Sequence, residues 1–243
     1  IMPEEEPHYG IHILPMPIII DGKTYFEGID ITMEEFYQKQ TSGSVITTSQ
    51  PSPGDVTDMW DRLLKAHDEI VFIPMSSGLS NTCQTALLLA EDELYKGRVF
   101  VVDNHRISVT QALAVLDAKV LADEGRIARE IKEILEQEAM DATIYIAVDT
   151  LEYLKKGGRI TAAAAALGTI LKLKPVLTIQ GDKLDSYAKA RGMKSAFRVM
   201  LEALKSDIAS RLSHLREKGL LKIGIANTMM DPDKLEIFKA ELK

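Results

Sequence analysis

Short apolar segments alternate with amphipathic segments over the first 150 residues, and this alternation limits the possible folds more than any other feature. The apolar segments are rich in β-branched residues and have the length of buried strands, and most precede a stretch with helical periodicity. Buried strands joined through helices are typical of a parallel sheet that helices cover on both faces. The predicted strands are residues 44–48, 69–75, 97–103 and 142–148, and the predicted helices are residues 53–67, 81–95, 108–125 and 127–140.

The first 40 residues predict a strand, a turn, a second strand and a helix. Residues 11–20 are apolar, and the Asp21-Gly22 pair that follows is a hairpin turn signal. Thr32, with Glu35 three residues later, has the pattern of a capping box at a helix start.

The pattern changes after about residue 150. We therefore predict an α/β protein of two domains, with a parallel-type sheet in residues 1–150 and a smaller α/β (α+β) domain in residues 151–243. The second domain is predicted to contain a short helix stopped by Gly157 and Gly158, a helix over residues 161–173, a hairpin over 174–191, a long helix over 194–219, a strand over 221–228 and a helix starting at Pro232 after the cap Asp231.

Composition excludes several classes of function. With 29 basic and 36 acidic residues the net charge is −7, which disfavours binding to nucleic acid phosphates. The single cysteine, Cys83, rules out an internal disulfide and a cysteine-type zinc site, and is typical of the reducing cytoplasm. No histidine pair has metal-binding spacing, no apolar run approaches the ~18 residues of a membrane helix, and the apolar start is too short and broken for a signal peptide. We predict a cytoplasmic protein with no metal, cofactor, nucleic acid partner or membrane segment, and expect the numbering, which opens at Ile1, to begin inside a longer native chain.

The segment "SSGLSNT", from Ser76 to Thr82, is the strongest candidate site. It brings Ser76, Ser77 and Gly78 to a helix start, where unpaired backbone N–H groups and the helix dipole favour an anion. It lacks the lysine of a nucleotide phosphate loop and the glycine pattern of a dinucleotide site. A single carboxylate therefore suits it better than a polyphosphate, while plain helix capping by Ser80 or a neighbouring serine explains the hydroxyls about equally well.

The segment "TTSQPS", from Thr47 to Ser52, is a second hydroxyl-rich loop at the same predicted edge. In parallel sheets ligands collect beyond the carboxyl ends of the strands, so Thr47, Thr48, Ser49 and the adjoining Gln50 could reach the same anion. Taken alone, the loop is better explained as a turn into a helix capped by Ser52.

Other residues support an alternative, catalytic function. A kinase or hydrolase for a small substrate would bind phosphate on the two loops and use His105 or Asp103 as a base. Ser76 or Ser77 as a nucleophile is disfavoured, because the G-x-S-x-G pattern is absent. Arg159, with two lysines before it, either forms a basic edge or complements a helix C-terminus, and we weigh these equally.

The order of these segments resembles the DegV family, and the likeness covers nearly the whole chain. The segments that carry it are residues 18–37 ("IIIDGKTYFEGIDITMEEFY"), 48–55 ("TSQPSPGD"), 76–86 ("SSGLSNTCQTA"), 101–108 ("VVDNHRIS"), 151–160 ("LEYLKKGGRI") and 171–184 ("LKLKPVLTIQGDKL").

The resemblance implies a lipid carrier, not an enzyme, that holds one long-chain fatty acid between two α/β domains. Thr48 and either Ser76 or Ser77 would bind the carboxylate, and the C-terminal domain would cover an apolar tunnel for the tail. Since each buried CH₂ contributes roughly 0.8 kcal/mol, a tail of about 14 to 18 carbons would supply most of the binding free energy. The family also implies a partner, a fatty acid kinase, which Arg159 and its neighbouring lysines would face.

The chain departs from the family pattern in several places. Asn227 stands where the family commonly has a histidine, so binding without kinase coupling is an open alternative. Val109, Thr110 and Gln111 replace small residues and glycine. The first strand, with its Asp-Ser motif, and the last strands of the family pattern are expected outside residues 1–243.

Overall fold

The computed structural model describes residues 1, 3–166, 173–179 and 183–242. The chain forms two compact units, residues 1–104 with 111–137 (unit 1) and residues 105–110 with 138–243 (unit 2). The boundary at residue 150 that we expect from the sequence stays a prediction.

Unit 1 contains two small sheets. In the first, β1 pairs antiparallel with both β2 and β3; in the second, β4 and β5 are parallel. The hairpin at Asp21 and the parallel pairing after β4 are therefore confirmed. The elements are η1 (Pro3–Glu5), α1 (Glu6–Tyr9), β1 (Pro17–Ile20), β2 (Lys23–Phe26), α2 (Met33–Thr41), β3 (Ile46–Thr48), α3 (Pro53–Leu63), β4 (Ile70–Phe72), α4 (Thr82–Leu89), β5 (Val99–Val101), α5 (Ser108–Asp123, shared with unit 2) and α6 (Ala128–Gln137).

The expectation that both hydroxyl loops leave one sheet is wrong for the described residues. The first loop leaves β3, which pairs antiparallel with β1 so that Thr48 lies opposite Ile18. The second loop leaves β4, whose described ladder is with β5 alone. The apolar runs alone do not distinguish these pairings, because strand partners depend on contacts distant in sequence.

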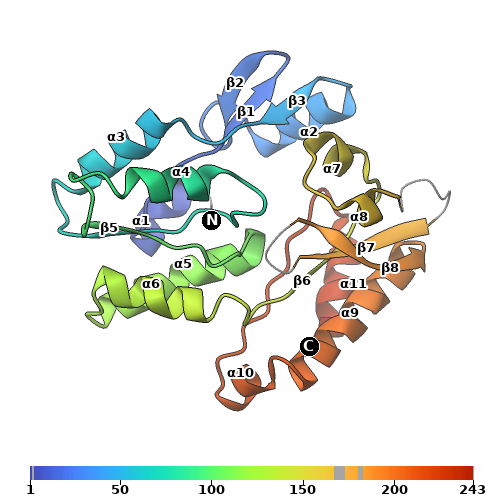
Figure 1. Cartoon of the computed structure of the whole chain (residues 1–243). Coiled ribbons are helices and arrows are strands. Elements are labelled where there is room, and N and C mark those ends of the chain that lie inside the picture. The colour runs from blue at the N-terminus through green and yellow to red at the C-terminus, as the bar shows by residue number, and fades with distance from the viewer. Residues whose placement is uncertain (2, 167–172, 180–182, 243) are drawn as a thin grey trace. The chain divides into compact units, whose positions relative to one another are not determined.

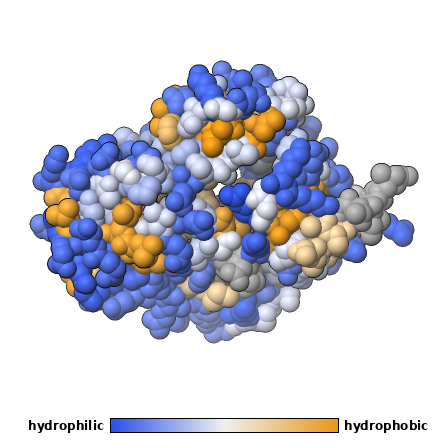
Figure 2. Space-filling view, turned by 45° about the horizontal axis from the view of Figure 1, so that its top comes forward, coloured by the Kyte–Doolittle hydropathy of each residue, from blue (hydrophilic) through white to orange (hydrophobic). Residues whose placement is uncertain are grey.

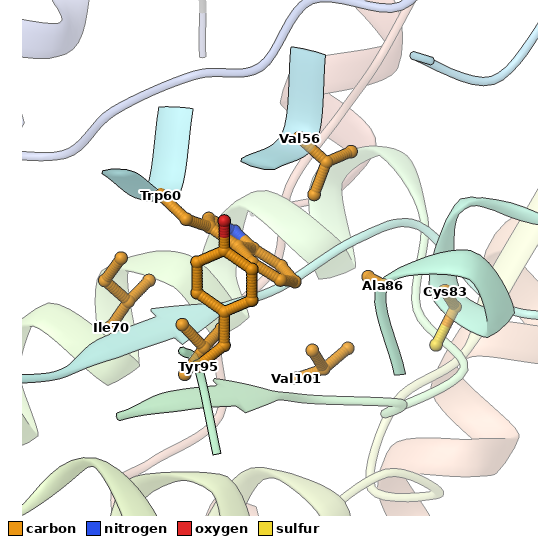
Figure 3. Packing of buried hydrophobic residues seen from close by; sticks show 8 residues of the cluster. Val56, Trp60, Ile70, Cys83, Ala86, Tyr95 and Val101 are labelled. Atoms are coloured by element: carbon orange, nitrogen blue, oxygen red, sulfur yellow. The ribbon is translucent and has the colours of Figure 1, made fainter. Parts of the chain in front are cut away.

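The core of unit 1 includes a cluster of buried hydrophobic residues that contains Trp60 and Tyr95 (Figure 3). Trp60 of α3 is fully buried and meets Phe72 and Tyr95 edge-on, with ring centroids 5.6 and 5.2 Å away. Such pairs contribute about 0.5–1.5 kcal/mol each beyond the burial of their area. A second group of buried residues, which includes Val102 and Leu135, packs α5 and α6 near the same strands. This packing sets the base on which α4 and its preceding loop rest.

Unit 2 is an antiparallel sheet of order β6-β7-β8, with α9 packed against all three strands (Figure 1). Val176 and Ala196 are fully buried in its core. The hairpin is confirmed as β7 and β8, although residues 180–182 of its predicted turn lie outside the described residues. The elements are β6 (Ile144–Ala147), α7 (Glu152–Gly157), α8 (Ala162–Ala166), β7 (Leu173–Ile179), β8 (Asp185–Arg191), α9 (Met193–Ala209), α10 (Ser213–Glu217) and α11 (Pro232–Leu242).

The long helix predicted over residues 194–219 is broken. α9 ends at Ala209, and Ser210 leaves helical geometry with φ −121° and ψ −94°. Arg211 then donates to the carbonyl oxygens of Met140 (2.5 Å) and Ala142 (3.1 Å). These tertiary bonds hold the break that a continuous helical pattern conceals.

The strand predicted over residues 221–228 is not formed. Among the described residues these positions pair with no other strand, and Ile223 is 48% exposed. A strand needs a neighbouring ladder for its backbone groups, and alternation in sequence cannot supply one. The helix beginning at Pro232 is confirmed, with the Asp231 carboxylate accepting from the N–H groups of Asp233 and Lys234. Only residues 162–166 of the predicted alanine-rich helix are described as helical, and 167–172 lie outside the described residues.

The surface is mixed in polarity. Figure 2 shows a face that is mostly hydrophilic, with separate apolar patches. No helix in the described part of the chain is long and apolar enough to span a membrane. Likewise, the described residues contain no group of three or more His, Cys, Asp or Glu side chains arranged to hold a metal ion.

Candidate functional site

The segment between β4 and α4 forms a compact turn. The carbonyl oxygen of Ser76 accepts from the N–H groups of Leu79 (3.0 Å) and Ser80 (3.2 Å), which closes the chain on itself. The Ser76 side chain is only 1% exposed, and its Oγ accepts from the Gly78 N–H at 3.2 Å. Ser76 therefore stabilises the turn from its buried side, whereas Ser77 is half-buried at the surface of the turn.

The backbone N–H groups of this turn are already used. The Ser77 N–H donates to Asp103 Oδ1 at 3.4 Å, and those of Gly78, Leu79 and Ser80 donate to Ser76. A phosphate cradle needs several such groups directed at the ligand. The N–H groups of residues 77–80 are therefore not directed at a ligand, and at these residues the side-chain hydroxyls are the groups that face an anion.

The second loop is tied to the first through Gln50. Thr48 is the last residue of β3 and is half-buried, while Thr47 and Ser49 are exposed. Gln50 Nε2 donates to Thr85 Oγ1 on α4 at 3.1 Å. This bond links the loop that follows Thr48 to the helix that follows Ser77, so the two hydroxyl loops belong to one part of unit 1.

Ser52 is the helix cap that the sequence offered as one explanation of its loop, whereas Ser80 lies one position before Asn81, the N-cap of α4, which has no side-chain cap bond. Ser80 Oγ accepts from the Thr82 N–H at 3.2 Å at the start of α4. Ser52 caps α3 in a reciprocal box with Asp55, with each side chain accepting from the other residue's N–H. Local hydrogen bonds from backbone N–H groups therefore account for the hydroxyls of Ser52 and Ser80 but not for those of Thr48 and Ser77. Within the described residues, neither Thr48 Oγ1 nor Ser77 Oγ forms a hydrogen bond.

A charged network adjoins the turn, and sequence reasoning missed it as a unit. The Asp103 N–H donates to Glu136 Oε1 at 3.0 Å, and Glu136 forms an ion pair with Lys132 one helical turn earlier. Lys132 Nζ also donates to the Val101 carbonyl at 2.6 Å. The i,i+4 spacing of Lys132 and Glu136 was the only sequence signal, and it is equally typical of an exposed helix face.

Cys83 is fully buried beside this network. Burial, and then the neighbouring Asp103 carboxylate, raise the pKa of the Cys83 thiol to about 12. A thiol that stays protonated is neither a nucleophile nor a metal ligand at neutral pH. Cys83 is thus a small core residue.

His105 and Arg159 lie in unit 2. His105 adopts a left-handed backbone with φ +55° and lines a pocket of about 20 Å³ together with Arg106 and Thr143. Such a volume holds about one water molecule and not an acyl chain. Arg159 Nη1 donates to the Gly157 carbonyl at 2.6 Å at the end of α7, so one of its contacts is that of a helix C-terminus.

Unit 2 also has an open groove of about 490 Å³ along α11. Ile223, Ile225 and Leu242 are among its lining residues, and none of the site residues predicted from the sequence lines it.

Comparison with known proteins agrees with this description. The sequence matches the DegV family, described as an uncharacterised protein family, over residues 1–243. A DegV domain-containing protein of Caldanaerobacter subterraneus subsp. tengcongensis is 35% identical over 206 residues, which make up 84% of this chain and 73% of that protein.

Two solved structures are similar in sequence and in fold. A fatty-acid-binding DegV family protein from Thermus thermophilus has 35% identity and a TM-score of 0.76, over 85% of this chain and 73% of that one. A fatty-acid-binding DegV family protein from Streptococcus agalactiae has 30% identity and a TM-score of 0.75, over 86% of this chain and 75% of that one. The chain described here belongs to the DegV family.

Proposed function

We propose that this protein binds a long-chain fatty acid, with the carboxylate on the hydroxyl groups of Thr48 and Ser77. The observation that carries the proposal is that these two half-buried hydroxyls have no hydrogen-bond partner among the described residues, while the N–H groups of residues 77–80 and the Ser80 hydroxyl are engaged. The fatty acid binding of the Thermus and Streptococcus relatives supports the same ligand class.

Of the two serines, we assign the ligand contact to Ser77. Ser76 is buried and already accepts from Gly78, so its removal would disturb the turn and not the ligand alone. Gly78 shapes the turn, because its N–H is taken by Ser76. Thr47 and Ser49 flank Thr48 on the exposed side, and Gln50 connects the loops instead of contacting the head group.

The tail supplies most of the affinity and the hydroxyls orient the head group. Each buried CH₂ contributes roughly 0.8 kcal/mol, whereas a hydrogen bond to a charged group contributes about 1.5–3 kcal/mol. A chain of about 14 to 18 carbons therefore outweighs two hydroxyl contacts. The apolar tunnel that the resemblance implies stays a prediction.

We further propose that the protein presents its fatty acid to a separate fatty acid kinase and acts in the cytoplasm. The family resemblance supports the first statement, and the single buried free cysteine supports the second. The exposed Lys155 and Lys156 beside Arg159 are the proposed partner-facing edge, although Lys156 already pairs with Glu152 at 2.8 Å. An enzyme that binds phosphate on the same hydroxyl loops is the second candidate, and we rank it lower because the N–H groups of residues 77–80 already donate within the protein.

The test is native mass spectrometry of the purified protein, followed by lipid extraction and titration with fatty acid. We expect one fatty acid per chain. Thr48→Ala and Ser77→Ala should each weaken binding about tenfold, the equivalent of one hydrogen bond to a charged group.

Ser80→Ala is the matched control, because it removes a hydroxyl of the same loop that already accepts from the Thr82 N–H. It should lower stability by about 1 kcal/mol, the net contribution of one hydrogen bond, and leave the affinity unchanged. A wild-type protein that carries no lipid and takes up none would refute the proposal. An equal loss of affinity in all three variants would refute the assignment of the site.

A further inference from the structure

The carboxylate of Asp103 accepts a hydrogen bond from a backbone N–H of the loop that we propose binds the fatty acid carboxylate, and the proposed function does not explain this contact. Asp103 follows β5, and 26 positions separate it from Ser77 in sequence. Its Oδ1 nevertheless accepts the Ser77 N–H. An aspartate at an anion site is unfavourable by charge alone, so its place there calls for a structural reason.

A hydrogen bond from its backbone N–H fixes the position of Asp103. Its N–H donates to Glu136 Oε1 on α6, and Glu136 is paired with Lys132, which also donates to the Val101 carbonyl. The ammonium group is thus shared between the side chain of α6 and the backbone of β5. This arrangement connects the end of β5, the last turns of α6 and the Ser77 turn in one chain of hydrogen bonds.

We propose that Asp103 is a positioning residue for the fatty acid carboxylate, acting through Ser77. By accepting the Ser77 N–H, it fixes the turn in the geometry that presents the Ser77 hydroxyl, and it removes that amide from the anion-binding groups. The inference rests on the proposed function, because it assigns a role to a residue of the same site.

The expected gain is preorganisation. A turn that is ordered before binding does not lose conformational freedom when the ligand arrives. Removing the hydrogen bond that orders the turn therefore weakens binding without removing a ligand contact. The effect of Asp103 must then depend on the Ser77 hydroxyl. A residue that only supports the fold would instead lower stability and leave the coupling to Ser77 at zero.

The experiment is a double-mutant cycle on fatty acid affinity with Asp103→Ala, Ser77→Ala and the double variant. Asp103→Ala should weaken binding about fivefold to tenfold in the wild-type background. In the Ser77→Ala background it should weaken binding by less than about twofold, because the group it positions is gone. Full additivity of the two losses would overturn the proposal.

Two variants provide controls. Asp103→Asn keeps an oxygen that can accept the Ser77 N–H, so it should bind within about threefold of wild type. A loss as large as that of Asp103→Ala would show that the charge matters and not the hydrogen bond, which also overturns the proposal. Asp61→Ala removes another carboxylate of unit 1, one that accepts from Tyr95 Oη at 2.9 Å, and should leave affinity unchanged.

A measurement on the wild-type protein covers the case in which Asp103→Ala fails to fold. Amide hydrogen exchange at Ser77 should be at least tenfold slower than in an unstructured peptide, and exchange at the peptide rate would overturn the proposal. The two proposals fail differently. A wild-type protein without fatty acid affinity refutes the function, whereas fatty acid binding that Asp103→Ala leaves intact refutes only the role of Asp103.

Discussion

Among the described glycines, Gly224 leaves the least room for a Cβ atom, and replacing it with alanine tests the packing of the 221–228 segment. A methyl group at this position would overlap Cγ1 of Val109 in the first turn of α5 and lie 3.3 Å from its Cβ. Val109 is β-branched and stiff at χ1, so it cannot easily rotate away. The absence of a side chain at Gly224 is therefore a packing requirement and not a matter of a left-handed backbone.

Two opposing effects set the change in the free energy of unfolding that Gly224→Ala causes. Overpacking of this kind costs typically 1–3 kcal/mol, and the lower backbone entropy of unfolded alanine returns about 0.4–1 kcal/mol. We expect Gly224→Ala to lower the free energy of unfolding by about 1–2 kcal/mol, or the melting temperature by roughly 2–8 °C. Urea denaturation followed by far-UV circular dichroism measures it. The fluorescence of the single tryptophan, Trp60, reports on unit 1 instead.

Shortening the Val109 side chain tests whether its overlap with the new methyl group causes the loss of stability. Val109→Ala creates the space that the new methyl needs, so the double variant should be more stable than the sum of the two losses predicts, by about 1 kcal/mol. Gly54→Ala is the matched control, because its new methyl would meet only Ser52 Oγ at an ordinary 3.7 Å. Its stability should stay equal or rise by about 0.5 kcal/mol. Strict additivity of Gly224→Ala and Val109→Ala would refute the reasoning.

Two further predictions concern side chains whose pKa is raised, the buried Cys83 and the half-buried Tyr145. Cys83, with a pKa raised to about 12, should resist a thiol reagent at pH 8 in the folded protein and react at once in urea; rapid labelling of the folded chain would contradict its burial. Burial and a hydrogen bond to Asp207 raise the pKa of Tyr145 from 10.0 to about 12, so its contribution to stability is complete below pH 10 and is lost as the pH rises towards 12. Unfolding titrations should show this loss between pH 10 and 12 and a smaller one in Tyr145→Phe, and identical pH profiles would contradict it.

Helix starts and turns could be predicted from the sequence because their causes are local. The capping boxes at Thr32 and Ser52 form as expected, and the Asp21-Gly22 turn closes the first hairpin. Each depends on residues within about four positions of one another, so the interaction is written in the spacing. The parallel pairing of β4 and β5 follows from the crossover helix between them.

Long-range partners were beyond such reasoning. The sheet to which β3 belongs and the break after Ala209 depend on groups tens of positions away. Residues 221–228 find no strand partner among the described residues, and their own alternation cannot supply one. A continuous helical pattern is compatible with one helix or two, and an apolar alternation is compatible with a paired or an unpaired strand. Such patterns indicate which side of a segment is buried and do not identify the element that packs against it.

Some features of the candidate site likewise follow from the sequence, and others follow only from the tertiary structure. The sequence by itself determined that two hydroxyl-rich loops end strands and precede capped helices, since this requires only residue type and spacing. Only the tertiary structure decided that Ser76 is buried while Ser77 lies at the surface of the turn, and that Asp103 accepts the Ser77 amide. Adjacent serines look alike in sequence, and they differ only once β5 and α6 bring a carboxylate and its partners against one of them.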